Sequence, residues 1–435
     1  MKGKIPSLSL SFFWSVLGTG GPLVLGLLTV PALLGGLGME RFGILTLVWT
    51  AIGYFGLFDF GLGRALTQRV ASRLAKVGVL RWRDVANGIY WMLGFGVLGS
   101  VVMGVVVFVY TRYGISLSAL LRDEALAAGL WAAVSIPLVT LSSGMRGILE
   151  GQQDFGKAAA LRGLLGVMNF GLPWLLVYVG HADLVAMVQS LVLARLLVLL
   201  LSVWWLKGIW FGRGEGEKRG DVENKELFQF GMWMTVSNVV GPFMVAADRF
   251  ILAGLLGAQL VAYYTVPQDA VLRLLVLPAA WATVWFPRFA GLWNSASAEA
   301  LREQLLRGVK VVMWGMGILC LALVIFAKPL LVFWLGIEFA KAAAALTQVL
   351  LVGVFFNSMA HIPLAALQAS GRVALTAKLH VVELLLYMPL LLWAVHSQGL
   401  MGAAWVWMAR TVIDFVFLFG FSLLRHDSSS VSDQG

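Results

Sequence analysis

Ionisable side chains lie inside stretches of this sequence that are otherwise almost entirely apolar. A charged side chain in the hydrocarbon region of a bilayer is costly, so such residues pair, face water or carry function. Acidic groups there can hold or release protons, and arginines can bind phosphate. The set comprises Asp59, Asp248, Arg249, Asp269, Arg273, Glu383, Arg410 and Asp414, accompanied by Arg195, Asn357, His361, Gln368 and His380.

Spacing along the chain groups some of these residues in pairs. Asp269 and Arg273 are four residues apart, as are Arg410 and Asp414, and residues at this spacing share one face of a helix. Each pair is either a neutralised ion pair within a helix bundle or part of the lining of a water-filled cavity. The sequence leaves both alternatives open.

Two further acidic residues differ in their surroundings. Glu383 lies in a leucine-rich stretch, three residues after His380. Burial disfavours an ionised carboxylate, so Glu383 is a candidate for carrying coupling protons, with a hydrogen bond between helices as the alternative. Asp248 and Arg249 are adjacent and point about 100° apart on a helix. At least one of them needs water or a partner on another helix.

The elements that must position these residues are membrane-spanning helices. Of the 435 residues, 60% are hydrophobic and 12% are charged, which is more apolar surface than a soluble core can bury. A helix crosses the hydrocarbon core with about 20 apolar residues and satisfies its own backbone. Stretches of this length are 9–35, 42–63, 86–110, 125–147, 159–179, 184–206, 228–254, 259–286, 308–327, 342–368, 374–395 and 400–422. The sequence predicts an all-α polytopic membrane protein with about twelve transmembrane helices in two six-helix bundles.

The distribution of positive charge predicts the orientation of these helices. If the N-terminus is cytoplasmic, 23 lysines and arginines fall in cytoplasmic segments and only five on the other face: Arg41, Arg112, Arg122, Lys328 and Lys341. This asymmetry indicates that both termini are cytoplasmic. The net charge of +10 therefore reflects topology, not nucleic-acid binding, and the same residues can contact anionic lipid headgroups.

A glycine-rich segment of mixed charge, 207–226, separates the first six predicted spans from the last six. We therefore expect an N-terminal bundle at 1–206, a cytoplasmic linker at 207–226, a C-terminal bundle at 227–425 and a disordered polar tail at 426–435.

The two halves also share helix-breaking residues at similar spacing. Pro22 precedes Gly38 by 16 residues, and Pro242 precedes Gly257 by 15. Matched positions of this kind favour a duplicated six-helix unit with parallel repeats, because each unit has an even number of spans.

Several features argue against an enzyme or a metalloprotein. The motifs Gly-x-Ser-x-Gly and His-Glu-x-x-His are missing from the sequence. Segment 151–158 has the glycine and lysine spacing of a phosphate-binding loop, but Ala158 stands where that loop needs Ser or Thr. One cysteine, Cys320, and five histidines give no zinc or haem spacing. We expect no catalytic activity, metal or cofactor.

Two smaller expectations concern the ends of spans. The apolar stretch 329–336 is too short to cross a bilayer and is expected to be interfacial or re-entrant. The first apolar run is too long for the core of a cleavable signal peptide, so we expect none.

Several passages carry a family resemblance that covers essentially the whole chain. They read GMERFGIL at 38–45, GLFDFGLGRAL at 56–66 and ADRFILAGLLG at 247–257, with RGILEGQQDF at 146–155 and LQASGR at 367–372. In this order the passages resemble the Wzx-like polysaccharide-biosynthesis and O-antigen flippases of the multidrug/oligosaccharidyl-lipid/polysaccharide exporter superfamily.

The resemblance implies a bacterial inner-membrane flippase that moves a polyprenyl-pyrophosphate-linked oligosaccharide to the outer leaflet. It implies alternating access through a V-shaped cavity between the halves, and partners among membrane lipids and glycan polymerase or export machinery. Lipid II flippases carry arginines in the first helix, and multidrug exporters often carry an acidic residue there. This chain has no basic residue between Lys4 and Arg41 and no acidic residue before Glu40.

On this hypothesis the buried charges take two roles. Cations would attract the pyrophosphate: Arg64, Arg249, Arg273 and Arg410, with Arg146 at the entrance. Carboxylates would balance those cations or carry coupling protons: Asp59, Asp248, Asp269, Glu383 and Asp414. The alternatives are a cation-coupled antiporter of drugs or small molecules and a membrane glycan polymerase.

Overall fold

The computed structural model describes residues 8–56, 61–115, 117–210, 247–295, 298–370 and 373–423. Within these ranges every regular element is helical and no strand occurs, so the predicted all-α class is confirmed. The chain divides into two compact units, Met1–Ala262 and Tyr263–Gly435. Only residues 207–210 of the predicted linker are described, as a short helix, and the tail at 426–435 lies outside the described residues. The predicted domain boundary therefore stays a prediction.

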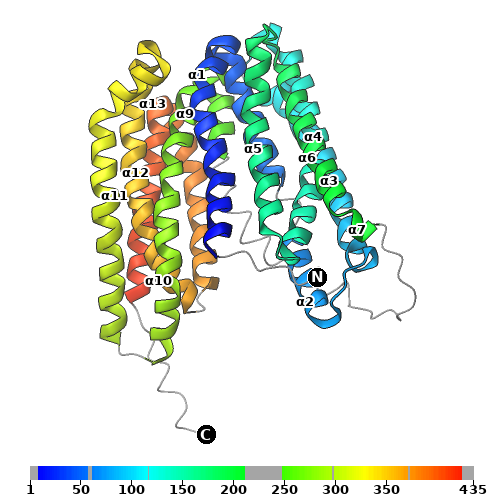
Figure 1. Cartoon of the computed structure of the whole chain (residues 1–435). Coiled ribbons are helices and arrows are strands. Elements are labelled where there is room, and N and C mark those ends of the chain that lie inside the picture. The colour runs from blue at the N-terminus through cyan, green and yellow to red at the C-terminus, as the bar shows by residue number, and fades with distance from the viewer. Residues whose placement is uncertain are drawn as a thin grey trace. The chain divides into compact units, whose positions relative to one another are not determined.

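The first unit is a bundle of helices (Figure 1), and the contacts between these helices place α4 at its centre. Its labelled helices are α1 (Leu8–Phe55), α2 (Leu62–Val77), α3 (Trp82–Val109), α4 (Ala119–Gly151), α5 (Phe155–Tyr178), α6 (Leu184–Trp205) and α7 (Lys207–Trp210). A π-helical turn, Tyr110–Gly114, ends α3, and residues 247–256 form a further helical segment. Helix α4 packs against α1, α2, α3, α5 and α6.

The second unit is arranged around α12 in the same way. After α9 (Ala258–Leu272), which begins at the end of the first unit, a 3₁₀ turn at Arg273–Leu275 leads into the remaining helices. These are α10 (Val276–Ser295), α11 (Ala298–Leu335), α12 (Ile337–Ala369) and α13 (Val373–Leu423). Helix α12 packs against α10, α11 and α13.

The central helices of the two units occupy equivalent places in the sequence. In its most apolar window, α4 is 50% buried inside the protein and α12 is 56% buried, whereas the other candidate spans range from 11% to 44%. Helix α4 contains the fourth predicted span of the first half, and α12 contains the fourth of the second half. This correspondence is what a duplicated six-helix unit would give.

Nine helices in the described ranges are long and apolar enough to cross a membrane. The difference from the twelve predicted spans has three sources. The first two predicted spans lie in the continuous helix α1, the last two lie in α13, and the seventh lies mostly outside the described residues. The chain is therefore a multi-pass membrane protein, and about twelve spans fit these observations.

Glycines interrupt the two merged helices at the points where the sequence separates their spans. Gly38 in α1 has φ 75° and ψ 167°, and Gly399 in α13 has φ 60° and ψ −138°. Neither conformation is helical, and a side chain at a positive φ of this kind would be strained. Each glycine therefore marks the turn between two membrane crossings.

Residues 329–335 do not form a separate re-entrant piece, because they belong to a continuous helix. Helix α11 continues through Pro329 and ends at Leu335. A proline removes one backbone hydrogen bond from a helix, and membrane helices tolerate that loss because packing against neighbours supports the bend. The stretch is thus the last two turns of a helix of 38 residues. This helix is longer than the roughly 20 residues that cross the hydrocarbon core, so an interfacial position of the stretch stays a prediction.

Small residues let α2 approach α4 closely. On α4, a methyl group added at Gly147 would overlap the backbone oxygen of Gly63, and one added at Gly151 would lie 2.7 Å from the backbone oxygen of Thr67. Glycines four residues apart commonly allow such backbone contact between membrane helices. The passage at 146–155 therefore has a packing role, because it provides the surface on which α2 docks.

We expect Gly147→Ala to lower the stability of the protein, because its methyl group cannot fit against the Gly63 carbonyl without moving α2. Overpacking of this kind costs about 1–3 kcal/mol. The measurement is the midpoint of thermal unfolding in detergent, followed by size-exclusion chromatography. Gly94→Ala is the matched control, because nothing lies within 4 Å of a methyl group at that position on α3. Equal midpoints for the two variants would contradict the packing argument.

Candidate functional site

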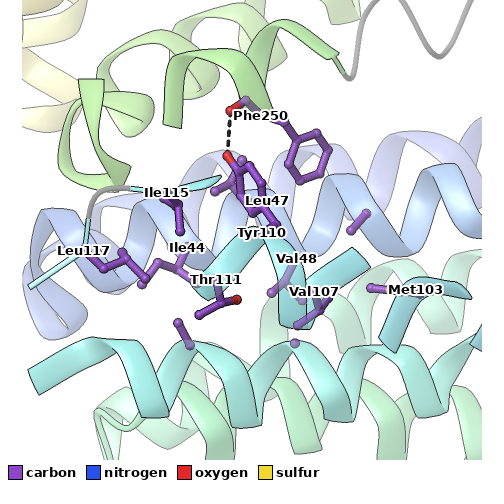
Figure 2. A pocket seen from close by; sticks show the side chains of 13 residues that line it. Ile44, Leu47, Val48, Met103, Val107, Tyr110, Thr111, Ile115, Leu117 and Phe250 are labelled. Atoms are coloured by element: carbon purple, nitrogen blue, oxygen red, sulfur yellow. Dashed lines mark hydrogen bonds between the residues drawn. The ribbon is translucent and has the colours of Figure 1, made fainter. Parts of the chain in front are cut away.

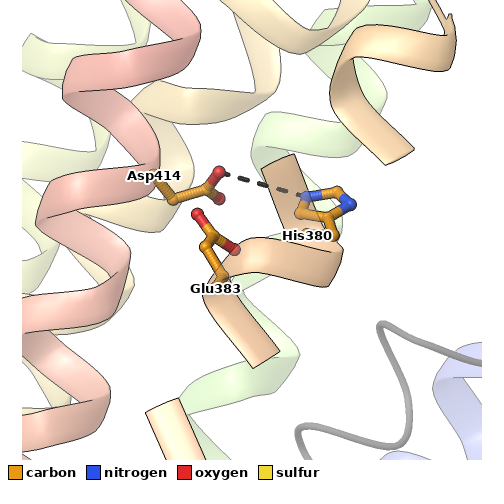
Figure 3. A group of neighbouring side chains, drawn as sticks. All are labelled: His380, Glu383 and Asp414. Atoms are coloured by element: carbon orange, nitrogen blue, oxygen red, sulfur yellow. Dashed lines mark ion pairs between the residues drawn. The ribbon is translucent and has the colours of Figure 1, made fainter. Parts of the chain in front are cut away.

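A cluster of four polar side chains in the second unit forms where α13 folds back on itself. The chain reverses at Gly399, and Gly402 lies so close to Ala394 that an added methyl group would overlap the Ala394 carbonyl. His380 and Glu383 on the first arm consequently lie beside Asp414 on the second arm (Figure 3). The reversal therefore brings together groups that are more than 30 residues apart in sequence.

The ionic neighbours within this group lie across the two arms. The Nε2 atom of His380 is 4.0 Å from Oδ1 of Asp414, and Nε of Arg410 is 3.8 Å from Oε2 of Glu383. The nearest ionic partner of Arg410 is thus Glu383 across the hairpin. It is not Asp414, although an ion pair with Asp414 on the same helix was one of the two alternatives that the sequence left open. We call these four residues the hairpin cluster.

The hairpin cluster is largely sheltered from solvent and incompletely hydrogen-bonded. Glu383 is 7% exposed, and the side chains of Asp414 and Arg410 are 13% and 15% exposed. Both carboxylate oxygens of Glu383, Oδ1 of Asp414 and Nε of Arg410 are buried and have no hydrogen-bond partner in the described part of the chain. Separations of 3.8–4.0 Å are too long for hydrogen bonds, so these atoms keep unused bonding capacity.

The charges of the hairpin cluster do not balance. Two carboxylates and one guanidinium give a net charge of −1 when His380 is neutral. Burying an uncompensated charge is strongly unfavourable, and one proton or one monovalent cation would remove the imbalance. The geometry therefore leaves one positive charge to be supplied, or one carboxylate to be protonated.

The same donor atoms have the spacing of a metal site, but the surrounding charge disfavours a divalent ion. One ligand atom each from His380, Glu383 and Asp414 lie within 4.8 Å of one another. Arg410 already places a positive charge 3.8 Å from Glu383, and a second, divalent cation beside it would be repelled. A proton or a monovalent cation fits the charge of the site better.

A second group of buried charges lies in the first unit, at the start of the helical segment 247–256. Asp248 is fully buried and Arg249 is 7% exposed. The Nη1 atom of Arg249 donates a hydrogen bond of 3.0 Å to Oγ1 of Thr50 on α1, and Oδ1 of Asp248 accepts one from the Arg249 backbone N–H. The expectation that one of these charges needs a partner on another helix is confirmed for Arg249.

An apolar pocket of about 60 Å³ lies close to this group in the first unit (Figure 2). The π-helical turn lines it, and the hydroxyl of Tyr110 donates a hydrogen bond of 2.6 Å to the backbone oxygen of Phe250. The remaining lining is almost entirely apolar, including Ile44, Leu47 and Met103. The pocket is far smaller than ligand sites of several hundred Å³, so it cannot hold a sugar or a pyrophosphate.

The other predicted site residues are dispersed over the chain. Arg146 on α4 and Asp269 on α9 are half-buried, and Arg273, the first residue of the 3₁₀ turn between α9 and α10, is exposed. Asp59 and the side chain of Arg64 lie outside the described residues. The structure thus brings three of the ten predicted residues together in the hairpin cluster, namely Glu383, Arg410 and Asp414.

Sequence reasoning missed the pairing across the hairpin and gave no role to Arg195. Residues 380 and 414, and residues 383 and 410, are almost symmetric about position 397, so a tight turn at Gly399 would have predicted their contact. Arg195 is 6% exposed on α6, and its Nη1 donates to Asn169 Oδ1 on α5 and to the Leu191 carbonyl. The hydrogen bond to Asn169 joins α5 to α6, and the one to Leu191 stays within α6.

Comparison with known proteins identifies relatives by sequence. Residues 10–293 match the family model described as "Polysaccharide biosynthesis protein". A Shigella flexneri protein named "Putative O-antigen transporter" is 30% identical over 419 residues, which cover 93% of this chain and 95% of that protein. The teichuronic acid biosynthesis protein TuaB of Bacillus subtilis (strain 168) is 22% identical over 361 residues, covering 83% and 70% of the two chains.

Solved structures show the same fold at lower sequence identity. An inward-facing multidrug resistance transporter of the MATE family, in the MOP superfamily, aligns with a TM-score of 0.70 and 15% identity, covering 94% of this chain and 97% of that one. A MOP-superfamily transporter from Pyrococcus furiosus aligns with a TM-score of 0.59 and 15% identity, covering 94% and 96%. The architecture is therefore that of MATE-like transporters.

The hairpin cluster predicts energetic coupling between Arg410 and Glu383. We expect Arg410→Met to destabilise the protein, because it leaves two carboxylates together without a guanidinium. Adding Glu383→Gln should recover part of the loss, with a coupling energy of about 1–3 kcal/mol. The measurement is a double-mutant cycle of unfolding free energies in detergent.

A pair on the surface of α11 provides the control for this cycle. Arg307 and Glu303 are 3.1 Å apart, and their side chains are 62% and 69% exposed. Exposed pairs four residues apart on a helix contribute about 0.3–0.5 kcal/mol, so Arg307→Met with Glu303→Gln should show much weaker coupling. Additive effects of Arg410→Met and Glu383→Gln would refute the pairing across the hairpin.

Proposed function

The chain belongs to the family of polysaccharide biosynthesis proteins, and we propose that it is a flippase for a polyprenyl-pyrophosphate-linked oligosaccharide. The observation that carries this proposal is the 30% identity to the Shigella flexneri relative over 95% of that protein. A substrate of this class has an apolar tail, an anionic linkage and a hydrated glycan. Its transfer between leaflets requires a polar path through the membrane and makes or breaks no covalent bond.

The proposed path uses positive side chains to attract the pyrophosphate. Guanidinium groups bind phosphate oxygens in bidentate fashion. Arg249 is buried beside α1 in the first unit, and Arg273 is exposed at the 3₁₀ turn in the second. Arg410 belongs to the hairpin cluster. Arg64 would be a further cation of the path, and Arg146 would attract the substrate at the entrance.

Coupling of transport to a cation gradient is assigned to the hairpin cluster. Its net charge of −1 gives it one binding place for a proton or a monovalent cation, shared by Glu383 and Asp414. Asp59, Asp248 and Asp269 would balance the arginines. Alternating access would then follow from movement of the bundle at 1–206 against the bundle at 227–425, with the binding state of the cluster favouring one orientation.

The proposed location is the bacterial inner membrane, with both termini in the cytoplasm. The excess of lysine and arginine on one side of the predicted spans supports this orientation. A flippase in this orientation would take its substrate from the cytoplasmic leaflet and deliver it to glycan polymerase or export machinery on the other side.

A second candidate function is cation-coupled export of drugs or other small molecules. The fold likeness to a multidrug resistance transporter favours it. The sequence relatives weigh against it, because their names refer to O-antigen transport and teichuronic acid biosynthesis. In addition, residues 8–39 contain no acidic side chain, whereas multidrug exporters of the superfamily often carry one in the first helix.

Deletion of the gene tests the proposed function. We expect polyprenyl-linked oligosaccharide to accumulate in the cytoplasmic leaflet of the deletion strain, because its route across the membrane is lost. The amount and the leaflet are measured by mass spectrometry of extracted lipids and by access to a membrane-impermeant glycan-modifying reagent. Normal levels together with normal surface glycan, and lost drug resistance, would favour the small-molecule exporter instead.

The same strain tests the role of the arginines. Expression of Arg273→Ala should fail to restore surface glycan, and its abundance in the membrane should match that of the wild type because the side chain is exposed. The control is Arg302→Ala, which changes an exposed arginine on α11 and should restore surface glycan fully. Full complementation by Arg273→Ala would remove this residue from the transport path.

A further inference from the structure

Helix α2 differs from the other helices of the first unit in length and composition. It has 16 residues, is too short to cross a bilayer and lies in sequence between the spans of α1 and α3. Figure 1 shows it at the end of the first unit where α7 also lies. A short helix that joins two membrane crossings lies at the level of the lipid headgroups.

One face of α2 is fixed against the rest of the first unit. Leu62, Leu66 and Val70 are buried in an apolar cluster that also includes Ile148 of α4 and Ile209 of α7. Together with the close contacts at Gly147 and Gly151, this packing fixes the rotation of α2 about its axis. The positions of its polar side chains are therefore determined by the fold.

The sequence of α2 and the following turn is strongly basic. Residues 62–83 contain no aspartate or glutamate and six basic residues: Arg64, Arg69, Arg73, Lys76, Arg81 and Arg83. The first acidic residue is Asp84, and it already has two partners. Its Oδ2 accepts a hydrogen bond of 2.9 Å from the Arg81 backbone N–H, and its Oδ1 lies 3.4 Å from Nε of Arg73.

Arg81 has hydrogen-bonding capacity that the described residues do not use. Its Nη1 atom is buried and has no hydrogen-bond partner in the described part of the chain, although its backbone N–H is bound by Asp84. Arg83 is exposed two residues further along the chain. A guanidinium with unused donors in a region of excess positive charge is the arrangement that binds phosphate oxygens.

Exposed apolar and aromatic residues flank this basic region in the sequence. Val77 and Val79 are 41% and 54% exposed in the turn between α2 and α3, and Tyr90 and Trp91 on α3 are 61% and 51% exposed. Tyrosine and tryptophan favour the membrane–water interface. The valines and the aromatic rings would therefore lie among acyl chains and headgroups, with the arginines at the level of the lipid phosphates.

We propose that α2 and the α2–α3 turn form a binding surface for anionic phospholipid headgroups, with Arg81 and Arg83 as its centre. The adjacent apolar residues favour a membrane phospholipid over the pyrophosphate of a transported substrate, because they would contact the acyl chains of the same lipid. Lipid binding at this surface would hold α2 in the interface and stabilise the end of the first unit. The inference does not depend on the proposed transport function.

Native mass spectrometry of the purified full-length protein tests this proposal, with phosphatidylglycerol and phosphatidylcholine as the added lipids. We expect the wild type to prefer phosphatidylglycerol. In the double variant Arg81→Gln and Arg83→Gln, the ratio of affinities for phosphatidylglycerol and phosphatidylcholine should fall about tenfold, because each basic group near an anionic surface contributes to the binding free energy. The matched control, Arg302→Gln with Arg307→Gln on exposed positions of α11, should keep the preference.

Further measurements separate the alternatives. Absence of any phosphatidylglycerol preference in the wild type, or an equal loss in the control variant, would overturn the proposal. Polyprenyl pyrophosphate should not displace phosphatidylglycerol at equal concentration. If it displaces phosphatidylglycerol from the wild type, the surface is reassigned to the substrate.

If the glutamine variant does not fold, the double variant Arg81→Lys and Arg83→Lys replaces it. Because this variant retains the positive charge, it should preserve at least part of the preference. Complete loss of the preference in a folded lysine variant would contradict an electrostatic surface.

Discussion

The imbalance of charge in the hairpin cluster is the constraint on which the account depends. A membrane protein can bury charged groups only when their charges are compensated, and here two carboxylates share one guanidinium. Arg410 is 3.8 Å from Glu383, and His380 is 4.0 Å from Asp414. One more positive charge would complete the compensation. In the proposed mechanism that charge is an exchangeable proton or monovalent cation, whose binding would couple the helices of the cluster to a cation gradient.

The rest of each unit is built to place such charges on rigid helices. Each unit surrounds one central helix, α4 or α12, and glycines allow close helix packing where a larger residue would collide. Gly147 and Gly151 do this between α4 and α2, and Gly402 does it between the arms of α13. In the first unit, Nη1 of Arg249 lies within hydrogen-bond distance of Thr50 on α1. The basic helix α2 adds a surface suited to lipid phosphates. Contact with lipid headgroups and the holding of buried charges are thus assigned to different helices of the chain.

Much of this arrangement is predictable from the sequence, and the limits have physical causes. Hydropathy located the membrane helices, because a span requires an uninterrupted apolar stretch of fixed minimum length. It also separated the spans at Gly38 and Gly399, although each of these glycines lies inside one continuous helical element.

Spacing of four residues suggested that Arg410 pairs with Asp414, but the hairpin offers Glu383 as a nearer partner. Local periodicity cannot anticipate a contact made across a turn. The stretch at 329–336 was set apart because it is too short to cross a bilayer by itself, whereas in the structure residues 329–335 continue helix α11. Asp59 and the side chain of Arg64 lie outside the described residues, so their roles remain predictions.

Translocation under an imposed cation gradient tests the central claim most directly. Proteoliposomes would contain the protein and a fluorescent polyprenyl-linked oligosaccharide, whose movement between leaflets is followed with a membrane-impermeant quencher. The account predicts that a proton or sodium gradient accelerates translocation by the wild type, and that Glu383→Gln abolishes this acceleration while the protein stays folded. Equal rates with and without either gradient, or a full response in Glu383→Gln, would contradict the assignment of coupling to the hairpin cluster.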